Sequence, residues 1–170
     1  MTVVTGRAYS STVSLTRPND TNAYTANDVI GTATGSTAAL AFANIGPSHV
    51  AEFMVTTVEL EIDITAVPGG MTSFRLYLYS VTPPSALGDN AAWDLPSGDR
   101  ASFLGYVDLG TPVDLGSTLY VQSTGVNRQF SMPGNIGGIL YGYLVTIGGY
   151  TPAAQSVFKV TIHGMGSNTY

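Results

Sequence analysis

One stretch of the sequence alternates strictly between apolar and acidic side chains: Val58-Glu59-Leu60-Glu61-Ile62-Asp63-Ile64. Successive side chains of a β-strand point to opposite faces, whereas on a helix residues two apart lie on nearly opposite sides. An alternation of this kind therefore predicts a half-buried strand. Its apolar members would face a core, and its three carboxylates would face solvent.

A second alternating segment, Ser73–Val81, follows after a short interval. It would place Phe74, Leu76 and Leu78 inward and Arg75, Tyr77 and Tyr79 outward. Pro and two Gly residues lie between the segments, in Ala66-Val67-Pro68-Gly69-Gly70-Met71, and indicate a turn. We therefore expect an antiparallel hairpin centred on Gly69, with Ile64 opposite Phe74, Ile62 opposite Leu76, Leu60 opposite Leu78, and Asp63 beside Arg75.

Similar short patterns recur along the chain, separated by Gly, Pro and Asn turns. They predict strands at Ala8–Thr16, Ala38–Ala43, Val50–Thr57 (which can continue into Val58–Ile64), Ser102–Leu109, Thr118–Ser123, Ile139–Ile147 and Ser156–His163. Between Thr82 and Ala101 lies the longest segment without a strand pattern, where Ala86–Leu95 has room for one helical turn. We expect an all-β fold: an antiparallel β-sandwich, as a jelly roll of about eight strands. It would form one domain over 1–170, with loose arms at 1–7 and 164–170.

The composition excludes several classes of function. Only 10% of the residues are charged and the net charge is −5, while 21 Thr and 15 Ser supply most of the polarity. Six scattered basic residues offer no patch for nucleic acid or an anionic membrane, so neither is an expected partner. The chain has no Cys, which excludes a disulfide framework and thiol catalysis. A surface so poor in charge suggests that much of it contacts other proteins.

Two groups of acidic residues were considered as metal sites. Carboxylates two apart on one strand lie roughly 6.6–7 Å from each other. Glu59, Glu61 and Asp63 are therefore interpreted as a solvated face that Arg75 partly neutralises. Asp89, Asp94 and Asp99 share one loop with Asn90, where carboxylates can hold calcium, but their spacing is not that of an EF-hand and all are common turn residues. No metal or cofactor is expected, and a cation in the 89–99 loop remains an alternative.

Candidates for catalysis are equally few. The two histidines are His49 and His163, and Ser48 adjoins the first, yet neighbours in sequence point apart on a strand. There is no Gly-x-Ser-x-Gly elbow and no paired-acid motif. We therefore predict no catalytic residue and no enzyme activity.

Aromatic residues remain as candidate binding groups: Tyr77, Tyr79, Tyr106, Tyr120, Tyr141, Tyr143 and Trp93. Aromatic rings stack on sugars and are also enriched at protein interfaces. The two explanations stay open, with packing in the core or at an interface favoured.

Several segments are similar to a known class of protein. They are Arg17–Tyr24 followed by Asp28–Gly31, then Pro84–Asp94, Asp99-Arg100 with Phe103–Tyr106, Gly142–Thr146 and Ser156–Thr161. Together they resemble small structural proteins of tailed bacteriophages and prophages, over about residues 17–163. The resemblance implies a virion component, as a capsid decoration (cement) protein with a jelly-roll fold, and it implies no catalytic residues.

From this resemblance we expect a non-enzymatic protein on the outer surface of the phage head. Its partners would be the major capsid protein and further copies of itself, as a homotrimer in the first place and a dimer in the second. The residues that contact the capsid are unknown at this stage. The alternative is a host-receptor or carbohydrate-binding module of a phage fibre or tail.

Overall fold

The computed structural model describes residues 6–45, 52–131 and 138–167. These residues form strands and loops without a helix, and Ala86–Leu95, which has room for one helical turn, contains none. The strands are β1 (Gly6–Thr16), β2 (Leu40–Phe42), β3 (Glu52–Ile62), β4 (Phe74–Tyr79), β5 (Phe103–Gly110), β6 (Val113–Asp114), β7 (Leu119–Ser131), β8 (Leu140–Thr146) and β9 (Val157–Ser167).

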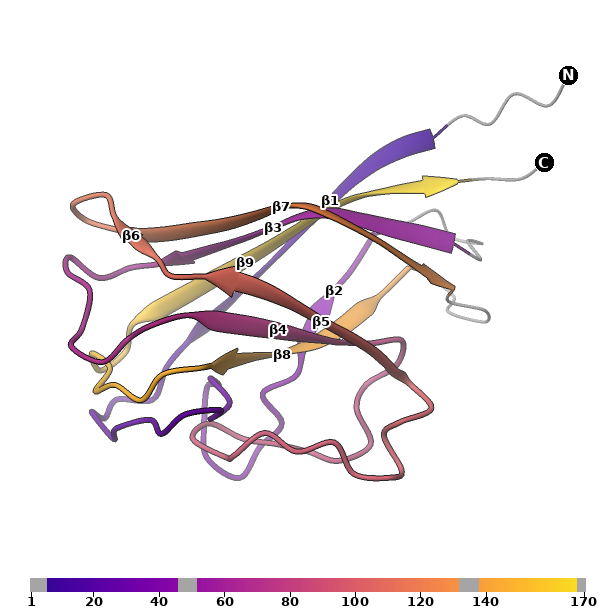
Figure 1. Ribbon diagram of the computed structural model, residues 1–170. Helices are drawn as coiled ribbons and strands as arrows, with labels where there is room; N and C mark the ends of the chain where they lie inside the picture. The colour runs from indigo at the N-terminus through magenta and orange to yellow at the C-terminus, as the bar shows by residue number, and fades with distance from the viewer. Residues whose placement is uncertain (1–5, 46–51, 132–137, 168–170) are drawn as a thin grey trace, which may run out of the picture.

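The strands form two sheets packed face to face (Figure 1). One sheet has the order β1-β9-β3-β7-β6 and the other β2-β8-β4-β5, and every pairing is antiparallel. Four pairs join the two halves of the chain: β1 with β9, β2 with β8, β3 with β7, and β4 with β5. This is a long hairpin rolled up so that β3 also meets β9 and β4 also meets β8. The strand order thus confirms the predicted jelly roll.

The predicted hairpin between the two alternating segments is wrong. Ile62 ends β3 in one sheet, where it pairs with Leu119 and Phe158, while Phe74 begins β4 in the other sheet. The turn between them crosses from sheet to sheet. Alternation could not reveal this crossing, because the apolar face of a strand is the same whether its chain neighbour lies beside it or across the core.

The inward faces were predicted correctly. Leu60, Ile62, Phe74 and Leu76 are all fully buried in one core between the sheets. The apolar side chains therefore decided which face is buried, although they did not decide which strands are neighbours.

Some strands are longer than the sequence indicated. The prediction Thr118–Ser123 covers less than half of β7, because Gly125 and Asn127, both with positive φ, interrupt its alternation. Gly6 and Arg7 pair with Ser167 and Gly166, so β1 and β9 extend into segments expected to be loose arms. Backbone pairing extends these strands where side-chain alternation has ended. The predicted strands Val50–Thr57 and Val58–Ile64 are continuous in β3 over Glu52–Ile62, and Val50 lies outside the described residues. The sequence did not predict β6.

The outer face of the β2-β8-β4-β5 sheet is covered, contrary to expectation. Tyr77 and Tyr79 of β4 point away from the core as predicted, but both are buried, with 4% and 0% of their surface exposed. Apolar side chains from residues 29–39 and from the 80–102 loop pack over this face (Figure 1). The long loop that looked structureless in the sequence is therefore a packed layer.

Candidate interaction surfaces

A second apolar cluster lies beneath the covering loops. It contains Val29, Ala38, Tyr77, Tyr79, Tyr143 and Val145, with Trp93 and other half-buried side chains around it. The rings of Tyr77 and Trp93 stack with 3.7 Å between centroids and 11° between planes. Most of these rings are packed against other side chains of the same chain, so they do not form an exposed surface on which sugars could stack.

The hydroxyl of Tyr143 joins the covering loops to the sheet. It donates to the carbonyl of Ser85 at 3.0 Å and accepts from the backbone N–H of Leu87 at 3.2 Å. It also lies 3.3 Å from the Thr37 hydroxyl. One side chain of β8 therefore fixes both covering segments.

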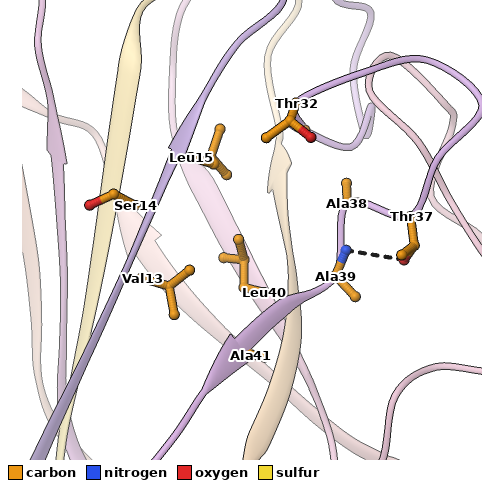
Figure 2. A pocket seen from close by; sticks show the side chains of 10 residues that line it. Val13, Ser14, Leu15, Thr32, Thr37, Ala38, Ala39, Leu40 and Ala41 are labelled. Carbon is orange, nitrogen blue, oxygen red and sulfur yellow. Dashed lines mark hydrogen bonds between the residues drawn. The ribbon is translucent and has the colours of Figure 1, made fainter.

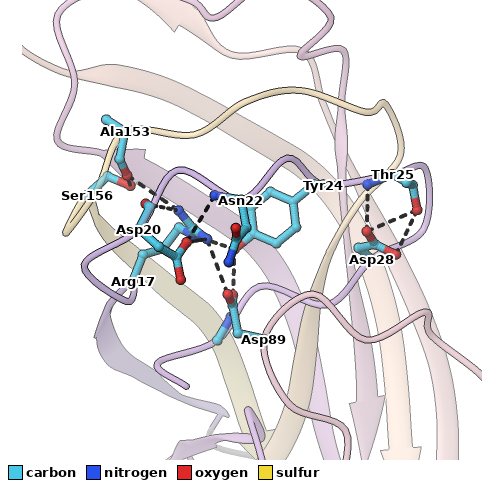
Figure 3. A network of polar contacts seen from close by, with 10 residues as sticks. Arg17, Asp20, Asn22, Tyr24, Thr25, Asp28, Asp89, Ala153 and Ser156 are labelled. Carbon is cyan, nitrogen blue, oxygen red and sulfur yellow. Dashed lines mark hydrogen bonds and ion pairs between the residues drawn. The ribbon is translucent and has the colours of Figure 1, made fainter. Parts of the chain in front are cut away.

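A buried ion pair anchors the same loops at their other end (Figure 3). Arg17 follows β1, and its guanidinium lies 3.2 Å from the carboxylate of Asp89, with side chains 0% and 2% exposed. Asp89 also accepts hydrogen bonds from the hydroxyl of Tyr24 and from the N–H of Gly31, while Arg17 pairs with Asp20 at 3.4 Å. Every charge in this cluster has partners, as a buried charge requires.

The electrostatics of the cluster favour a charged Arg17 and a neutral Tyr24. Burial raises the pKa of Tyr24 well above its usual value, and the hydrogen bond and negative charge of Asp89 add to this. Burial opposes the charge of Arg17, but Tyr24 and Asp89 outweigh it and raise the pKa of that guanidinium. Both raised pKa values keep the proton on Arg17 and on Tyr24, so the cluster has a structural role. We call these three side chains, Arg17, Tyr24 and Asp89, the buried lock.

The loop carboxylates considered as a calcium site are not brought together. Asp89 belongs to the ion pair with Arg17, and Asp99 accepts from the N–H and hydroxyl of Ser85. Asp94 is exposed and accepts from the N–H of Leu95. Among the residues that the structure describes, no group of three potential ligands could hold a metal ion.

The outer face of the other sheet carries the acidic residues and is uncovered. Glu61 pairs with Lys159 of β9 at 3.0 Å, and Glu59 lies 3.5 Å from His163 of the same strand. Arg75, the predicted partner of Asp63, instead pairs with Asp108 at 2.7 Å. The solvated face was predicted correctly and its neutralising partner wrongly, because β9 is the neighbour of β3.

The histidines offer no catalytic arrangement within the described residues. His163 projects from the uncovered sheet face and contacts Glu59. His49 and Ser48 lie outside the described residues. None of the described residues forms a helix that could span a bilayer.

Exposed apolar side chains lie in the segment before β7 and in the segment after β3. Leu115 is 65% exposed and Val113 is 56% exposed, at the turn that joins β6 to β7. Val67, 39% exposed, lies in the crossing between β3 and β4. Both loops start beside the pair Ile62–Leu119, and they lie at the left of Figure 1. We call these three side chains the apolar loop end; no signal in the alternation pattern had selected them.

A polar and aromatic cluster lies on β4 and β5. Tyr106 is 43% exposed, and the guanidinium of Arg75 lies 4.3 Å from the centre of its ring. Arg75 is at the same time bound to Asp108. Tyr106 is the most exposed of the aromatic candidates among the described residues, but its open face is occupied by a cation that already has a partner.

A pocket opens between β1 and the segment that leads into β2 (Figure 2). Val13 and Leu15 lie on the side of β1 that faces Leu40, and Ser14 points to the other side. The rest of the lining consists of small residues from 31–32 and 37–41. The sandwich is therefore open along its β1–β2 side and offers an apolar recess there.

Comparison with known proteins assigns the chain to no family and gives no function. No family matches the chain, and no curated protein is similar to it in sequence. Similar solved structures include a chain of the cyanophage Pam1 capsid (13% identity, covering 95% of this chain and 85% of that chain, TM-score 0.38). A chain of the Kashmir bee virus virion is 14% identical, with 94% of this chain and 70% of that chain covered and a TM-score of 0.30. A lipoprotein of Bacteroides thetaiotaomicron is 10% identical, with 98% of this chain and 88% of that chain covered and a TM-score of 0.39. With such TM-scores these likenesses carry no functional argument, and the chain is placed among jelly-roll β-sandwiches by its own strand order.

Proposed function

We propose that this chain is a non-enzymatic structural protein of a tailed-phage virion, a capsid decoration protein that binds the outer surface of the head and stabilises it. The observation that carries the proposal is that the segments resembling phage structural proteins are neighbours in the fold. Asp28 bridges to Ala92, and Val29 bridges to Val145, so Asp28–Gly31, Pro84–Asp94 and Gly142–Thr146 form one hydrogen-bonded layer. Residues that resemble a family and build one packed unit support a shared architecture rather than a chance similarity.

The character of that layer fits a structural role. Arg17, Tyr24 and Asp89 all belong to the resembling segments, and together they make the buried lock. Their interactions hold two loops on a sheet. A decoration protein requires a rigid body of this kind, because its effect depends on contacts and not on chemistry.

The apolar loop end is the surface we propose for contact with the major capsid protein. Exposed apolar side chains that gather at one place on a protein surface mark contact sites. Leu115 and Val113 are the most exposed large apolar side chains among the described residues. Binding to the assembled shell and not to its opened state stabilises the shell by mass action.

The first experiment compares heads that carry the protein with heads that lack it. Heating should release DNA at a lower temperature from heads without the protein. Because charge contributes little to the contact, attachment should persist from low to moderate salt. If both preparations release DNA at the same temperature, the stabilising role is wrong.

A pair of variants tests the proposed contact surface. The double substitution Val113→Ser and Leu115→Ser should reduce binding to heads by more than tenfold, since few residues dominate an interface. Val81→Ser is the matched control, because Val81 is 51% exposed but lies in the loop after β4. Equal binding of both variants would exclude the apolar loop end as the contact.

The position in the particle separates this proposal from its alternative. A cryo-EM map of the virion should show the chain on the head, together with further copies of itself. If the chain is found on the tail or a fibre and binds glycans on an array, it is a receptor- or carbohydrate-binding module instead.

A further inference from the structure

The described strands at the edges of the two sheets differ in how well they resist further pairing. β2 has three residues and β6 has two, which is too short to serve as a template. β5 shifts register twice against β4, and its Gly105 and Gly110 have positive φ. Beyond β6, β7 is kinked at Gly125 and Asn127. Short, bulged and twisted edges are the features by which β-proteins prevent edge-to-edge association.

β1 has none of these features. It pairs with β9 without interruption over 11 residues, from Gly6 with Ser167 to Thr16 with Val157. The stretch Ala8–Thr16 contains no charged residue and no proline. A long edge without a bulge, and without charge over Ala8–Thr16, is the arrangement that accepts another strand.

The register shows which backbone groups this edge presents. The N–H of Arg17 donates to the carbonyl of Ser156 at 3.0 Å, which continues the ladder between β1 and β9. Backbone groups of alternate residues point to opposite sides of a strand. Odd-numbered residues of β1 therefore bond to β9, and the free edge presents the N–H and C=O groups of Ala8, Ser10, Thr12, Ser14 and Thr16.

We propose that β1 of a second copy of this chain pairs with this edge, antiparallel and about a two-fold axis through Thr12. In this register Thr12 faces Thr12 of the second copy, Ser10 faces Ser14, and Ala8 faces Thr16. About ten backbone hydrogen bonds would form, two for each of the five facing pairs. Ser and Thr opposite one another on the outer face are favourable cross-strand pairs, and no charged residues face each other within Ala8–Thr16.

The two nearest alternative registers are less favourable. An axis through Ser11 places Arg7 opposite the buried Leu15. An axis through Val13 places Pro18 opposite Ala8, where an N–H donor is needed and proline has none. The axis through Thr12 keeps an N–H donor at every facing position from Ala8 to Thr16.

The pocket beside the edge gives the second copy a further contact. With the axis at Thr12, Tyr9 of one copy lies opposite Leu15 of the other. Leu15 lines the pocket together with Val13 and Leu40. Tyr9 is half-buried in the isolated chain, and its ring would cover this apolar recess. Two-fold symmetry makes the contact occur twice, which is the isologous arrangement of a closed dimer.

A dimer was the second of the two oligomeric states expected from the sequence, and this edge favours it over the trimer. The inference does not depend on binding to phage heads, because it concerns only the chain in solution. If the chain does not dimerise, the proposed function is unaffected. If it does not bind phage heads, the proposed dimer is unaffected.

Disulfide trapping tests the axis directly, because the chain contains no cysteine. Facing residues of a hydrogen-bonded antiparallel pair have Cα atoms about 5.5 Å apart, within the range of a disulfide. Thr12→Cys should therefore give a covalent dimer under mild oxidation. Ser14→Cys alone should not, since its copies lie four residues out of register, roughly 13 Å apart. Mixing Ser10→Cys with Ser14→Cys should restore the cross-link. Cross-linking of Ser14→Cys alone, or none by Thr12→Cys, would overturn the proposed register.

Blocking the edge tests the dimer itself. Sedimentation should show the unmodified chain as a dimer and Thr12→Pro as a monomer, because proline removes an edge N–H without touching the ladder to β9. Thr12→Lys should also be monomeric, since it brings two like charges together on the axis. Gln122→Lys, on the outer face of β7, is the control and should remain dimeric. A monomeric or trimeric unmodified chain, or a dimer that survives both Thr12 substitutions, would show that the edge is not used.

Discussion

The outer faces of the two sheets differ in their exposure to solvent. The β1-β9-β3-β7 sheet leaves its outer face bare, with surface ion pairs such as Glu61–Lys159, whose side chains are 36% and 43% exposed. The β2-β8-β4-β5 sheet is covered by side chains from residues 29–39 and 80–102, which bury a cluster of tyrosines, and the ion pair that anchors these loops is buried as well. The same alternating strand pattern underlies both faces. The difference arises because the second sheet receives the two long loops.

The comparison shows that burial, and not residue type, decides what a polar group contributes. Arg17–Asp89 and Lys159–Glu61 are both pairs of a cation and a carboxylate. Only the first is sealed from water, where removal of one partner leaves an uncompensated charge. The four predictions that follow test this contrast, beginning with the largest expected effect.

Asp89→Ala should destabilise the protein by about 3–5 kcal/mol, because Arg17 and Tyr24 lose their buried partner. Urea unfolding monitored by tyrosine fluorescence measures the change. Asp94→Ala is the control: it removes an exposed carboxylate from the same loop and should change stability by less than about 0.5 kcal/mol. Equal effects of the two substitutions would mean that the covering layer is not locked by Asp89.

Tyr143→Phe should cost about 1–3 kcal/mol, because the covering loops lose the hydroxyl that joins Ser85 and Leu87 to β8. Proteolysis between residues 80 and 102 should accelerate as the loop opens. The neighbouring Tyr141→Phe, on a half-buried ring of the same strand, should leave both quantities nearly unchanged. Unaltered proteolysis of Tyr143→Phe would contradict the anchoring role.

Alkaline pH should lower the free energy of unfolding, because the tyrosines of the covered face are buried. Burial raises the pKa of Tyr79 to about 12, whereas an unfolded tyrosine titrates near pH 10. Between these values the unfolded state binds fewer protons, so the free energy of unfolding falls as pH rises. Burial also raises the pKa of Tyr24 and Tyr150. Tyr79→Phe should make the decline between pH 10 and 12 shallower, and Tyr106→Phe should not; an identical slope for both would contradict this account.

Lys159→Ala should have the smallest effect, less than about 1 kcal/mol, because its pair with Glu61 is exposed to solvent. The effect should shrink further as salt screens the pair, which denaturation at low and high ionic strength would reveal. A loss comparable with that of Asp89→Ala would mean that the bare face is in fact covered in solution.

Much of the fold followed from alternation. The strand segments, their inward faces and the jelly-roll class were predicted, since side-chain period and turn residues are local properties. The pairing of β3 with β4 was wrong, because whether a turn folds back or crosses the sandwich depends on the other strands. The candidate surfaces were harder to predict. The rings of Tyr77 and Tyr79 face outward as expected, and only the position of the 80–102 loop decides that they are buried.

The sequence by itself determined the class of the fold, the apolar face of each strand, and a composition poor in charge. These properties depend on residue types and on spacings of a few positions. The tertiary structure alone decided that Arg17 meets Asp89 across 72 positions, that β9 neutralises the acidic stripe of β3, and that β1 is left as an edge. Such contacts depend on how strands distant in the chain are ordered within the sheets, and local pattern carries no information about that order.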